Sequence, residues 1–424
     1  MVSALRWRVG RDATLLIGGQ AVRAAGYGFT AVILGALLAA RGYSHMRAGL
    51  VLTALIAGTA LASLAVGSVA DRVGRRLSYA VFFLVVAVAG AVVAAGAPFW
   101  LLLVVALTGA LSTDVVDNGP ATTLEQVMLS AEDAGTARVY GRYNAVGAAA
   151  GAFGALAAIL PGLGDHNLDA GTYAALFAVL VPVGLAGALL AWRLSPAVEA
   201  PASGPPRLGA AVRSAERLGE SRGVVRRLAT LFAIDAAGGG LATTGFLSYL
   251  FAERYGVSLA ALGWLFFAVS LVQAVSVALA APLARRFGLV ATMVGTHLPS
   301  NVLLAAVAFA PTFPVAAALL LARTTLSQMD VPTRQALVMT VVTPAERTAA
   351  AAVTNAARYT VRPIGPLIAG ALQQIALGAP LVLAGAIKGG YDLTLWRWAR
   401  HLPLHRPSDQ PAPTEPEPAS EEVP

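Results

Sequence analysis

Long apolar stretches dominate this chain and restrict its fold more than any other feature. Twelve of them have membrane-spanning length, and only 12% of the 424 residues are charged. Soluble domains carry about 25% charged residues, and a helix needs about 20 mostly apolar residues to cross a bilayer. Each stretch must satisfy its own backbone hydrogen bonds in lipid, which predicts helices. The predicted spans are 13–39, 47–70, 77–97, 99–122, 137–160, 171–192, 228–251, 259–283, 289–310, 313–333, 348–371 and 374–396.

A polar, proline-containing segment over 194–227 follows six spans and precedes six. A tether of this kind suits two bundles that move relative to one another. We therefore predict an all-α membrane protein with 12 transmembrane helices in two six-helix bundles. Its expected parts are a cytoplasmic N-terminus (1–12), an N-terminal bundle (13–193), a cytoplasmic linker (194–227), a C-terminal bundle (228–398) and a disordered cytoplasmic tail (399–424).

The net charge of +8 reflects topology rather than a nucleic-acid partner. If the spans alternate, 21 of the 30 Lys and Arg residues fall on the side of the termini. Only Arg41, Arg47 and Arg254 fall in the opposite loops, and the others lie within spans. Short basic loops are retained in the cytoplasm. The bias predicts that both termini are cytoplasmic, with no nucleic acid as partner.

An internal repeat relates the two predicted bundles, because similar motifs occupy matching spans. Two similar halves of this kind predict a pseudo-two-fold axis along the membrane normal between the bundles. The matched motifs are Asp71-Arg-Val-Gly74 with Arg285-Arg-Phe-Gly288, Asp117-Asn-Gly-Pro120 with Asp330-Val-Pro332, and Asn144 with Asn355.

A charged turn over 67–76 is predicted between the second and third spans. Glycine permits a sharp reversal and close helix approach. The segment resembles the loop signature of the major facilitator superfamily, and the resemblance covers about 13–396. It implies a transporter that works by alternating access, with no cofactor and no enzymatic activity. The residues that carry the signature, predicted to gate the cytoplasmic side, are Gly67, Asp71, Arg72, Gly74, Arg75 and Arg76, and Asp117 is expected to join them.

Ionisable residues inside spans are costly, by at least about 2.5–3.5 kcal/mol at the bilayer centre, and should face a cavity or a partner. In the superfamily that the chain resembles, spans 1, 4, 7 and 10 line the cavity. The resemblance therefore implies Arg23, Asp114, Asp235 and Arg323 as its charged lining. The full predicted pathway for substrate or protons is Arg23, Gln20, Tyr27, Asp114, Asp235, Arg323, Asn355 and Arg358.

Several of these residues also have a purely structural interpretation. Arg23 and Asp114 can neutralise one another instead of binding substrate. Asp117 and Glu125 lie within plausible reach of Arg75. The counterpart of Asp117 in the repeat is Asp330, with Arg334 or Arg286 as its expected neighbour, and Lys388 can contact lipid headgroups by snorkelling.

The function predicted from the sequence is secondary transport of a small molecule, with proton-coupled efflux as the first interpretation. Asp114 and Asp235 are the candidate proton carriers. The alternatives are proton-coupled uptake, or a receptor or lipid flippase with the same fold. The expected setting is the inner (plasma) membrane of a bacterium, as a monomer. No nucleotide-binding loop or metal-ligand spacing is present in the sequence.

Overall fold

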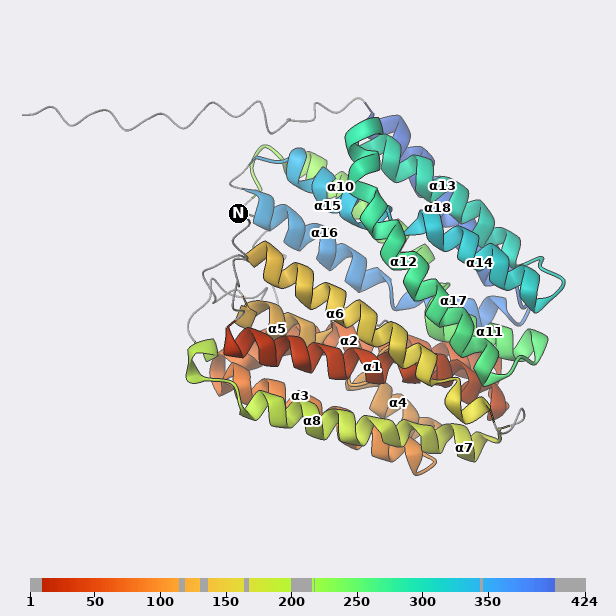
Figure 1. The fold of residues 1–424 in the computed structure, drawn as a ribbon. Helices are drawn as coiled ribbons and strands as arrows, with labels where there is room; N and C mark the ends of the chain where they lie inside the picture. The colour runs from red at the N-terminus through yellow and green to blue at the C-terminus, as the bar shows by residue number, and fades with distance from the viewer. Residues whose placement is uncertain are drawn as a thin grey trace, which may run out of the picture.

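The computed structural model describes residues 10–113, 119–129, 136–163, 168–199, 216, 218–343 and 346–400, without the side chains at 67, 68, 71, 136–138 and 348. In these ranges all regular secondary structure is helical, and the helices run roughly side by side (Figure 1). The predicted fold class is confirmed. The domain boundaries remain a prediction, because most of the linker and of the tail lies outside the described residues.

The N-terminal bundle contains the first six spans. Four spans are single helices, the fourth is divided into two, and the sixth contains a 3-10 turn. The bounds are α1 Arg11–Ala40, α2 His45–Val73, α3 Arg75–Ala94, α4 Phe99–Leu107 with α5 Pro120–Leu129, α6 Thr136–Ala157, and α7 Ala170–Ala175 with η2 Leu176–Val179 and α8 Leu180–Trp192; the short turns η1 Leu160–Gly162 and η3 Pro196–Glu199 follow α6 and α8.

The C-terminal bundle contains the other six spans, and three of them are divided. The bounds are α10 Arg222–Gly240 with α11 Thr244–Tyr255, α12 Leu259–Phe287, α13 Leu289–Val307, α14 Phe313–Ser327 with α15 Asp330–Thr340, α16 Arg347–Val361 with α17 Ile364–Leu372, and α18 Ala379–Ala399.

Local chemistry explains where two of the divided spans break. Pro363 has no backbone N–H to donate and follows the end of α16. The break between α10 and α11 lies against it, because Gly240 and Gly365 approach so closely that a Cβ on either would meet the other's backbone or its neighbours. The predicted continuous helix 99–122 is wrong: α4 ends at Leu107, and Gly109 adopts a left-handed conformation (φ 72°) against Gly58.

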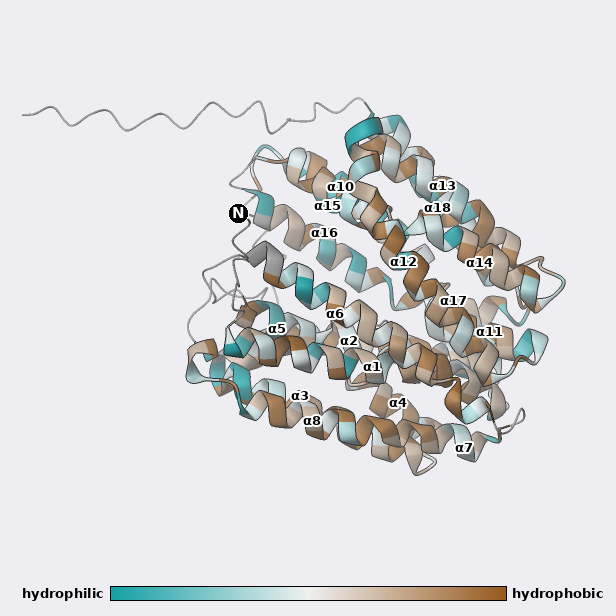
Figure 2. Cartoon of the chain, viewed as in Figure 1, coloured by the Kyte–Doolittle hydropathy of each residue, from teal (hydrophilic) through white to brown (hydrophobic). Residues whose placement is uncertain are grey.

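Large apolar side chains cover the outside of the molecule. Val88, Trp192 and Phe309 are all exposed, and Figure 2 shows hydrophobic residues along the spanning helices. A soluble monomer rarely exposes so much continuous apolar surface. Within the described residues, seven helical segments are by themselves long and apolar enough to cross a membrane. The outer surface therefore fits lipid. Most of the spans outside these seven are divided into two helices by the breaks described above.

The two bundles meet near one end of the molecule. We call the end that carries Arg11 and Ala399 the terminal face and the end that carries Ala40 and Ala379 the far face. The closely packed pairs across the bundles are α1 with α11 and α12, α2 with α11 and α17, and α6 and η1 with α12.

These contacts lie toward the far face. The Ser248 hydroxyl donates to the Val32 carbonyl at 2.6 Å, and Gly49 lies against Gly370. The helices that reach the terminal face behave differently. Among the described elements, α5, α10, α15 and α16 pack closely only on helices of their own bundle. The far face is closed, and the terminal face is the end at which the bundles separate (Figure 1).

Candidate functional site

Each bundle contains a buried cluster of charged residues. In the N-terminal bundle, Arg23 of α1 pairs with Glu125 of α5 at 2.9 Å, and both side chains are almost fully buried. The Tyr79 hydroxyl donates to Glu125 at 2.5 Å, and the Tyr143 hydroxyl donates to its second oxygen. Arg23 also donates to Thr122 at 3.0 Å. Satisfied hydrogen bonds of this kind are what allow an ion pair to remain buried.

Small residues make room for this cluster. Gln20 precedes Arg23 by one turn of α1 and accepts a hydrogen bond from it. Gly147 of α6 faces Gln20, and a Cβ there would lie 2.5 Å from its side-chain nitrogen. Gly19 makes room for Tyr79 in the same way. Gln20 and Arg23 of α1 therefore point into their own bundle.

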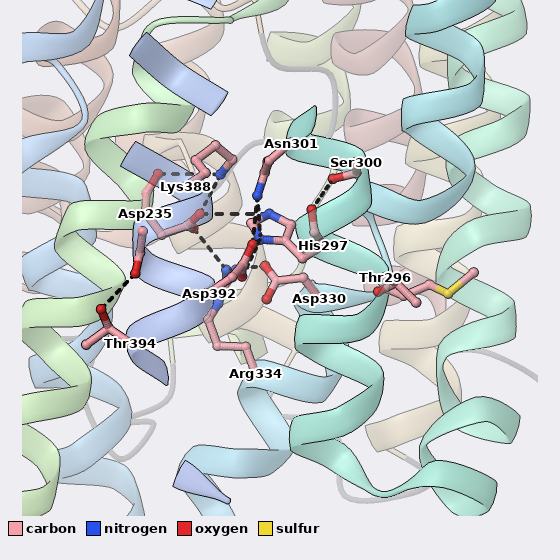
Figure 3. Close-up of polar contacts among 12 residues, drawn as sticks. Asp235, Thr296, His297, Ser300, Asn301, Asp330, Arg334, Lys388, Asp392 and Thr394 are labelled. Carbon is pink, nitrogen blue, oxygen red and sulfur yellow. Dashed lines mark hydrogen bonds and ion pairs between the residues drawn. The ribbon is translucent and has the colours of Figure 1, made fainter. Parts of the chain in front are cut away.

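The cluster in the C-terminal bundle is larger and is centred on Asp235 of α10. The Lys388 ammonium of α18 donates to one carboxylate oxygen at 2.5 Å. Arg334 of α15 lies 3.4 Å from the other oxygen and 2.6 Å from Asp330, one turn earlier on α15. Figure 3 shows side chains from α10, α13, α15 and α18 converging on this point.

A buried histidine connects the cluster to a second carboxylate, Asp392. His297 of α13 has its Nε2 3.9 Å from Asp235, and its Nδ1 lies 2.9 Å from Asp392 of α18. Asn301, one turn further along α13, donates to Asp392 at 2.8 Å. All four side chains are buried. A continuous polar chain thus links Lys388 and Asp235 to Asp392 through one imidazole.

The comparisons with known proteins agree with this architecture. The family model of the Major Facilitator Superfamily matches residues 16–366. The chain belongs to the Major Facilitator Superfamily. This transporter is 26% identical over 393 residues to the uncharacterized membrane protein YJR124C of Saccharomyces cerevisiae, with 85% of this chain and 88% of that protein covered.

Solved transporters share the fold of this facilitator at low sequence identity. A mutant of the nucleoside transporter NupG superposes with a TM-score of 0.72 at 13% identity, covering 91% of this chain and 98% of its own. A D-xylose–proton symporter gives 0.67 at 17% identity, with 92% and 98% covered. The chain is a multi-pass membrane transporter and not an enzyme, and these two proteins show that the fold alone leaves the substrate open.

The two clusters of this facilitator occupy spans that the internal repeat relates. Spans 1 and 4 supply Arg23 and Glu125, and spans 7 and 10 supply Asp235 and Arg334. The polarity is reversed, because the cation lies on the first span of one bundle and on the fourth span of the other. The repeat therefore conserves the position of an ion pair between these spans, with its charges exchanged.

Two predicted cavity residues have no hydrogen-bond or ion-pair partner within the described part of the chain. They are Arg323 of α14 and Arg358 of α16, and the Nε of each is buried and unbonded. Arg358 borders a pocket of about 50 Å³ together with Phe232, Arg334 and Asn355. Arg334, which borders the same pocket, lies 3.4 Å from Asp235.

The predicted gating segment is not a loop. Helix α2 continues to Val73, and Gly74 alone separates it from α3, with a φ of 104°. Glu199 accepts hydrogen bonds from the backbone N–H groups of Arg75 and Arg76 at 2.7 and 2.9 Å. A carboxylate is favourable at a helix N-terminus, where backbone donors are free. Arg72 is exposed in the last turn of α2.

Several predicted neighbours differ from the contacts found. Arg23 pairs with Glu125, and Asp114 and Asp117 lie outside the described residues, as do the side chains of Gly67 and Asp71. Glu125 binds Arg23 rather than Arg75. Lys388 does not snorkel, because it is buried against Asp235. Asp330 does lie beside Arg334, while a gating role for it stays a prediction.

Part of both clusters was not predicted from the sequence. Tyr79 and Tyr143 looked like ordinary aromatic residues of apolar spans, and His297 and Asp392 were not considered as a pair. The available signal was the spacing on α18: Lys388 and Asp392 are one turn apart, so they occupy the same face of a helix. Two ionisable residues on one face of a span indicate a buried partner.

The remaining predicted pathway residues have different surroundings. The Tyr27 hydroxyl donates to the Ala110 carbonyl at 2.9 Å, beside the break in the fourth span. Its ring also lies 5.7 Å from the Arg23 guanidinium. Asn355 is exposed on α16. The described pathway residues therefore fall into three groups. Arg23, Gln20 and Tyr27 are buried in the N-terminal bundle, Asp235 is buried in the cluster of the C-terminal bundle, and Arg323, Asn355 and Arg358 are less buried.

Proposed function

We propose that this facilitator is a proton-coupled secondary transporter of a small molecule, with Asp235 as the carboxylate that binds the proton. It works by alternating access as a monomer in the plasma membrane, with both termini in the cytoplasm. The asymmetry of its basic loops supports this orientation. In that orientation the terminal face is the cytoplasmic side, and the conformation described above is inward-facing.

The observation that carries the proposal is the position of Asp235. Its carboxylate contacts Lys388 and Arg334, which belong to different helices, and His297 lies at 3.9 Å. Protonation of Asp235 removes the negative charge through which α10 attracts Lys388 and Arg334. The cations then repel one another, and α15 and α18 are free to shift relative to α10. A single proton can therefore change how three spans pack.

The direction of transport depends on how the proton and the substrate influence one another. Export against an inward proton gradient, the direction first predicted, requires that the two occupy the protein in turn. Uptake requires that both bind together, because proton binding must then favour the substrate. The two directions differ in the sign of one coupling free energy, which can be measured directly.

A proton-flux assay tests the proposal. The purified protein is reconstituted in liposomes that contain a pH-sensitive dye, and a panel of nucleosides, sugars, carboxylates and organic cations is added outside. We expect one class to change the internal pH with wild-type protein and to leave it unchanged with Asp235→Asn. Arg226→Gln, at an exposed position of α10, serves as the control.

Two results would contradict the proposal. The first is transport without any change in internal pH. The second is proton coupling of wild-type size in Asp235→Asn. If no member of a broad panel is transported although the protein is folded, the receptor or lipid-flippase alternative is favoured instead.

A further inference from the structure

We infer that Arg323 and Arg358 bind the anionic group of the substrate, so that the transported molecule is an organic anion carrying a carboxylate or a phosphate. This inference deepens the proposed function and rests on it for the claim that the bound anion is transported. The observations behind it are two guanidiniums without partners in the described ranges, one pocket, and the Asp235 carboxylate that contacts Arg334 beside that pocket.

Hydrogen bonding distinguishes Arg323 and Arg358 from the paired arginines. Arginine carries five N–H donors in a planar fork and stays charged, so a buried guanidinium needs acceptors. Arg23 and Arg334 have carboxylate partners at 2.9 and 2.6 Å. Arg323 and Arg358 have none within the described ranges, and the Nε of each is buried without a partner. Both guanidiniums therefore keep N–H donors that are available to an anionic ligand inside the membrane.

Arg323 and Arg358 both lie near breaks in their spans. Arg323 lies in the last turns of α14, close to the break that separates α14 from α15. Arg358 lies in the last turn of α16, close to its own break at Pro363. Half-helix ends near the middle of a membrane are common substrate-binding positions in secondary transporters. Both residues thus belong to the parts of spans 10 and 11 that line such sites.

A small pocket lies beside Arg358. Phe232, Arg334 and Asn355 border it as well, and its volume is about 50 Å³. One liquid water molecule occupies about 30 Å³, so the pocket fits a small polar group and not a whole substrate. Arginine and asparagine supply donors, and the planar guanidinium matches a carboxylate or a phosphate in a bidentate manner. The phenylalanine ring offers a surface for the apolar part of the same ligand.

The charge of Asp235 links binding of the anion to binding of the proton. Asp235 lies 3.4 Å from Arg334, which borders the pocket together with Arg358, so its negative charge competes with an incoming anion for the positive charge at the pocket. Protonation of Asp235 removes that competitor and frees positive charge for the ligand. The proton and the anion therefore favour one another's binding, and by linkage the effect is reciprocal. This sign corresponds to symport, which under an inward proton gradient is uptake.

The test begins with chemical labelling, which needs no known substrate. Phenylglyoxal modifies accessible, unpartnered arginines, and mass spectrometry locates the product. With protein in liposomes, we expect modification at Arg323 and Arg358 and little at Arg23 and Arg334. Benzoate and phenyl phosphate should reduce the labelling of Arg323 and Arg358, whereas benzamide and benzylamine should not. Protection by benzoate alone indicates a carboxylate substrate, and protection by phenyl phosphate alone indicates a phosphate.

Variants then measure the contribution of each arginine to binding. Removing one charged hydrogen-bond donor weakens binding by roughly 10- to 100-fold. We expect this loss for the best protecting anion with Arg323→Gln or Arg358→Gln and a smaller loss with the matched Lys variants. Arg226→Gln should bind as wild type. In each variant the thermal midpoint without ligand reports whether the protein is folded.

The outcomes separate this inference from the proposed function. If labelling at Arg323 and Arg358 is absent, or if neutral or cationic analogues protect as well as anions, the inference is wrong. If a neutral substrate is found whose transport needs protons and Asp235, the proposed function stands and the inference falls. If anions bind through both arginines but their transport moves no protons, the anion site stands and the proton coupling falls.

Discussion

The Lys388 ammonium on α18 lies 2.5 Å from the Asp235 carboxylate on α10, in the interior of the C-terminal bundle. This contact gives the twelfth span a direct electrostatic link to the seventh, whereas snorkelling of Lys388 to lipid headgroups was the interpretation from the sequence. It also brings α18 into contact with the group proposed to bind the proton. A helix at the edge of the bundle is thereby coupled to the chemistry at its centre.

The ion pair predicts a non-additive mutant cycle. Lys388→Met leaves Asp235 with one cation fewer, and breaking a buried pair costs about 3–5 kcal/mol. The double variant Asp235→Asn with Lys388→Met should lose clearly less than the sum of the two single variants, since no buried charge is then left alone. Thermal midpoints in detergent measure this. Strict additivity would show that the two side chains do not interact in the folded protein.

The cluster in the N-terminal bundle predicts a graded series. Glu125→Gln leaves Arg23 without its counter-ion and should destabilise by about 3–5 kcal/mol. Tyr143→Phe removes one hydroxyl that donates to Glu125 and should cost only about 1–2 kcal/mol. Thermal midpoints of the two variants give the order, and equal losses would contradict the central role assigned to the ion pair.

The one-residue connection at Gly74 predicts a strong effect of a small substitution. Its φ of 104° and ψ of 142° lie in a region that only glycine adopts easily, so Gly74→Ala should cost about 1–3 kcal/mol. Gly288, which joins α12 to α13 with a φ of 88°, should respond similarly. Gly295→Ala is the control, because it lies within α13 with free space around the added Cβ. It should be neutral or slightly stabilising.

A pH dependence is expected at the terminal face. Hydrogen bonds from the Ser221 hydroxyl and the Gly219 backbone N–H lower the pKa of Glu346 below its usual 4.5. A lowered pKa in the folded state means that the stabilisation is present above 4.5 and is lost as the pH falls through the folded-state value. The wild type should therefore lose more thermal stability between pH 6 and pH 3 than Glu346→Gln. Parallel curves for the two proteins would contradict this.

The closed far face predicts that its packing controls the conformational equilibrium. A Cβ added to Gly35 of α1 would lie 2.6 Å from the Gly245 carbonyl oxygen of α11. Gly35→Val should open this end and bring the bundles together at the terminal face. The chain contains no cysteine, so spin labels can be placed at Arg72→Cys and Arg286→Cys without altering other residues.

The distance between these two labels should shorten in Gly35→Val. Gly295→Val, where the added side chain has room, should leave the distance distribution as in the wild type. Unchanged distances in Gly35→Val would mean that the contact between α1 and α11 does not set the conformation.

The amino-acid sequence determined the number of spans, the division into two bundles and the family, because each depends on local properties. A run of about 20 apolar residues favours a helix in lipid wherever it packs, because its backbone must be hydrogen-bonded internally, although the positions of the breaks within spans were not predicted. The glycine of the turn after α2 was also predictable, although the connection is shorter than expected. Arg23 and Asp235 were recognisable as functional candidates because charge inside a span is costly.

Partner choice was decided only by the tertiary structure. Asp114 was the partner considered for Arg23 from the sequence, whereas the structure places Glu125 of α5, beyond the break in the fourth span, against it. Lys388 met Asp235 because α18 packs against α10 in this bundle, a contact that no local pattern encodes. Ion pairs between distant spans depend on helix rotation and depth, and a change of one residue, about 100° around the axis, exchanges one partner for another.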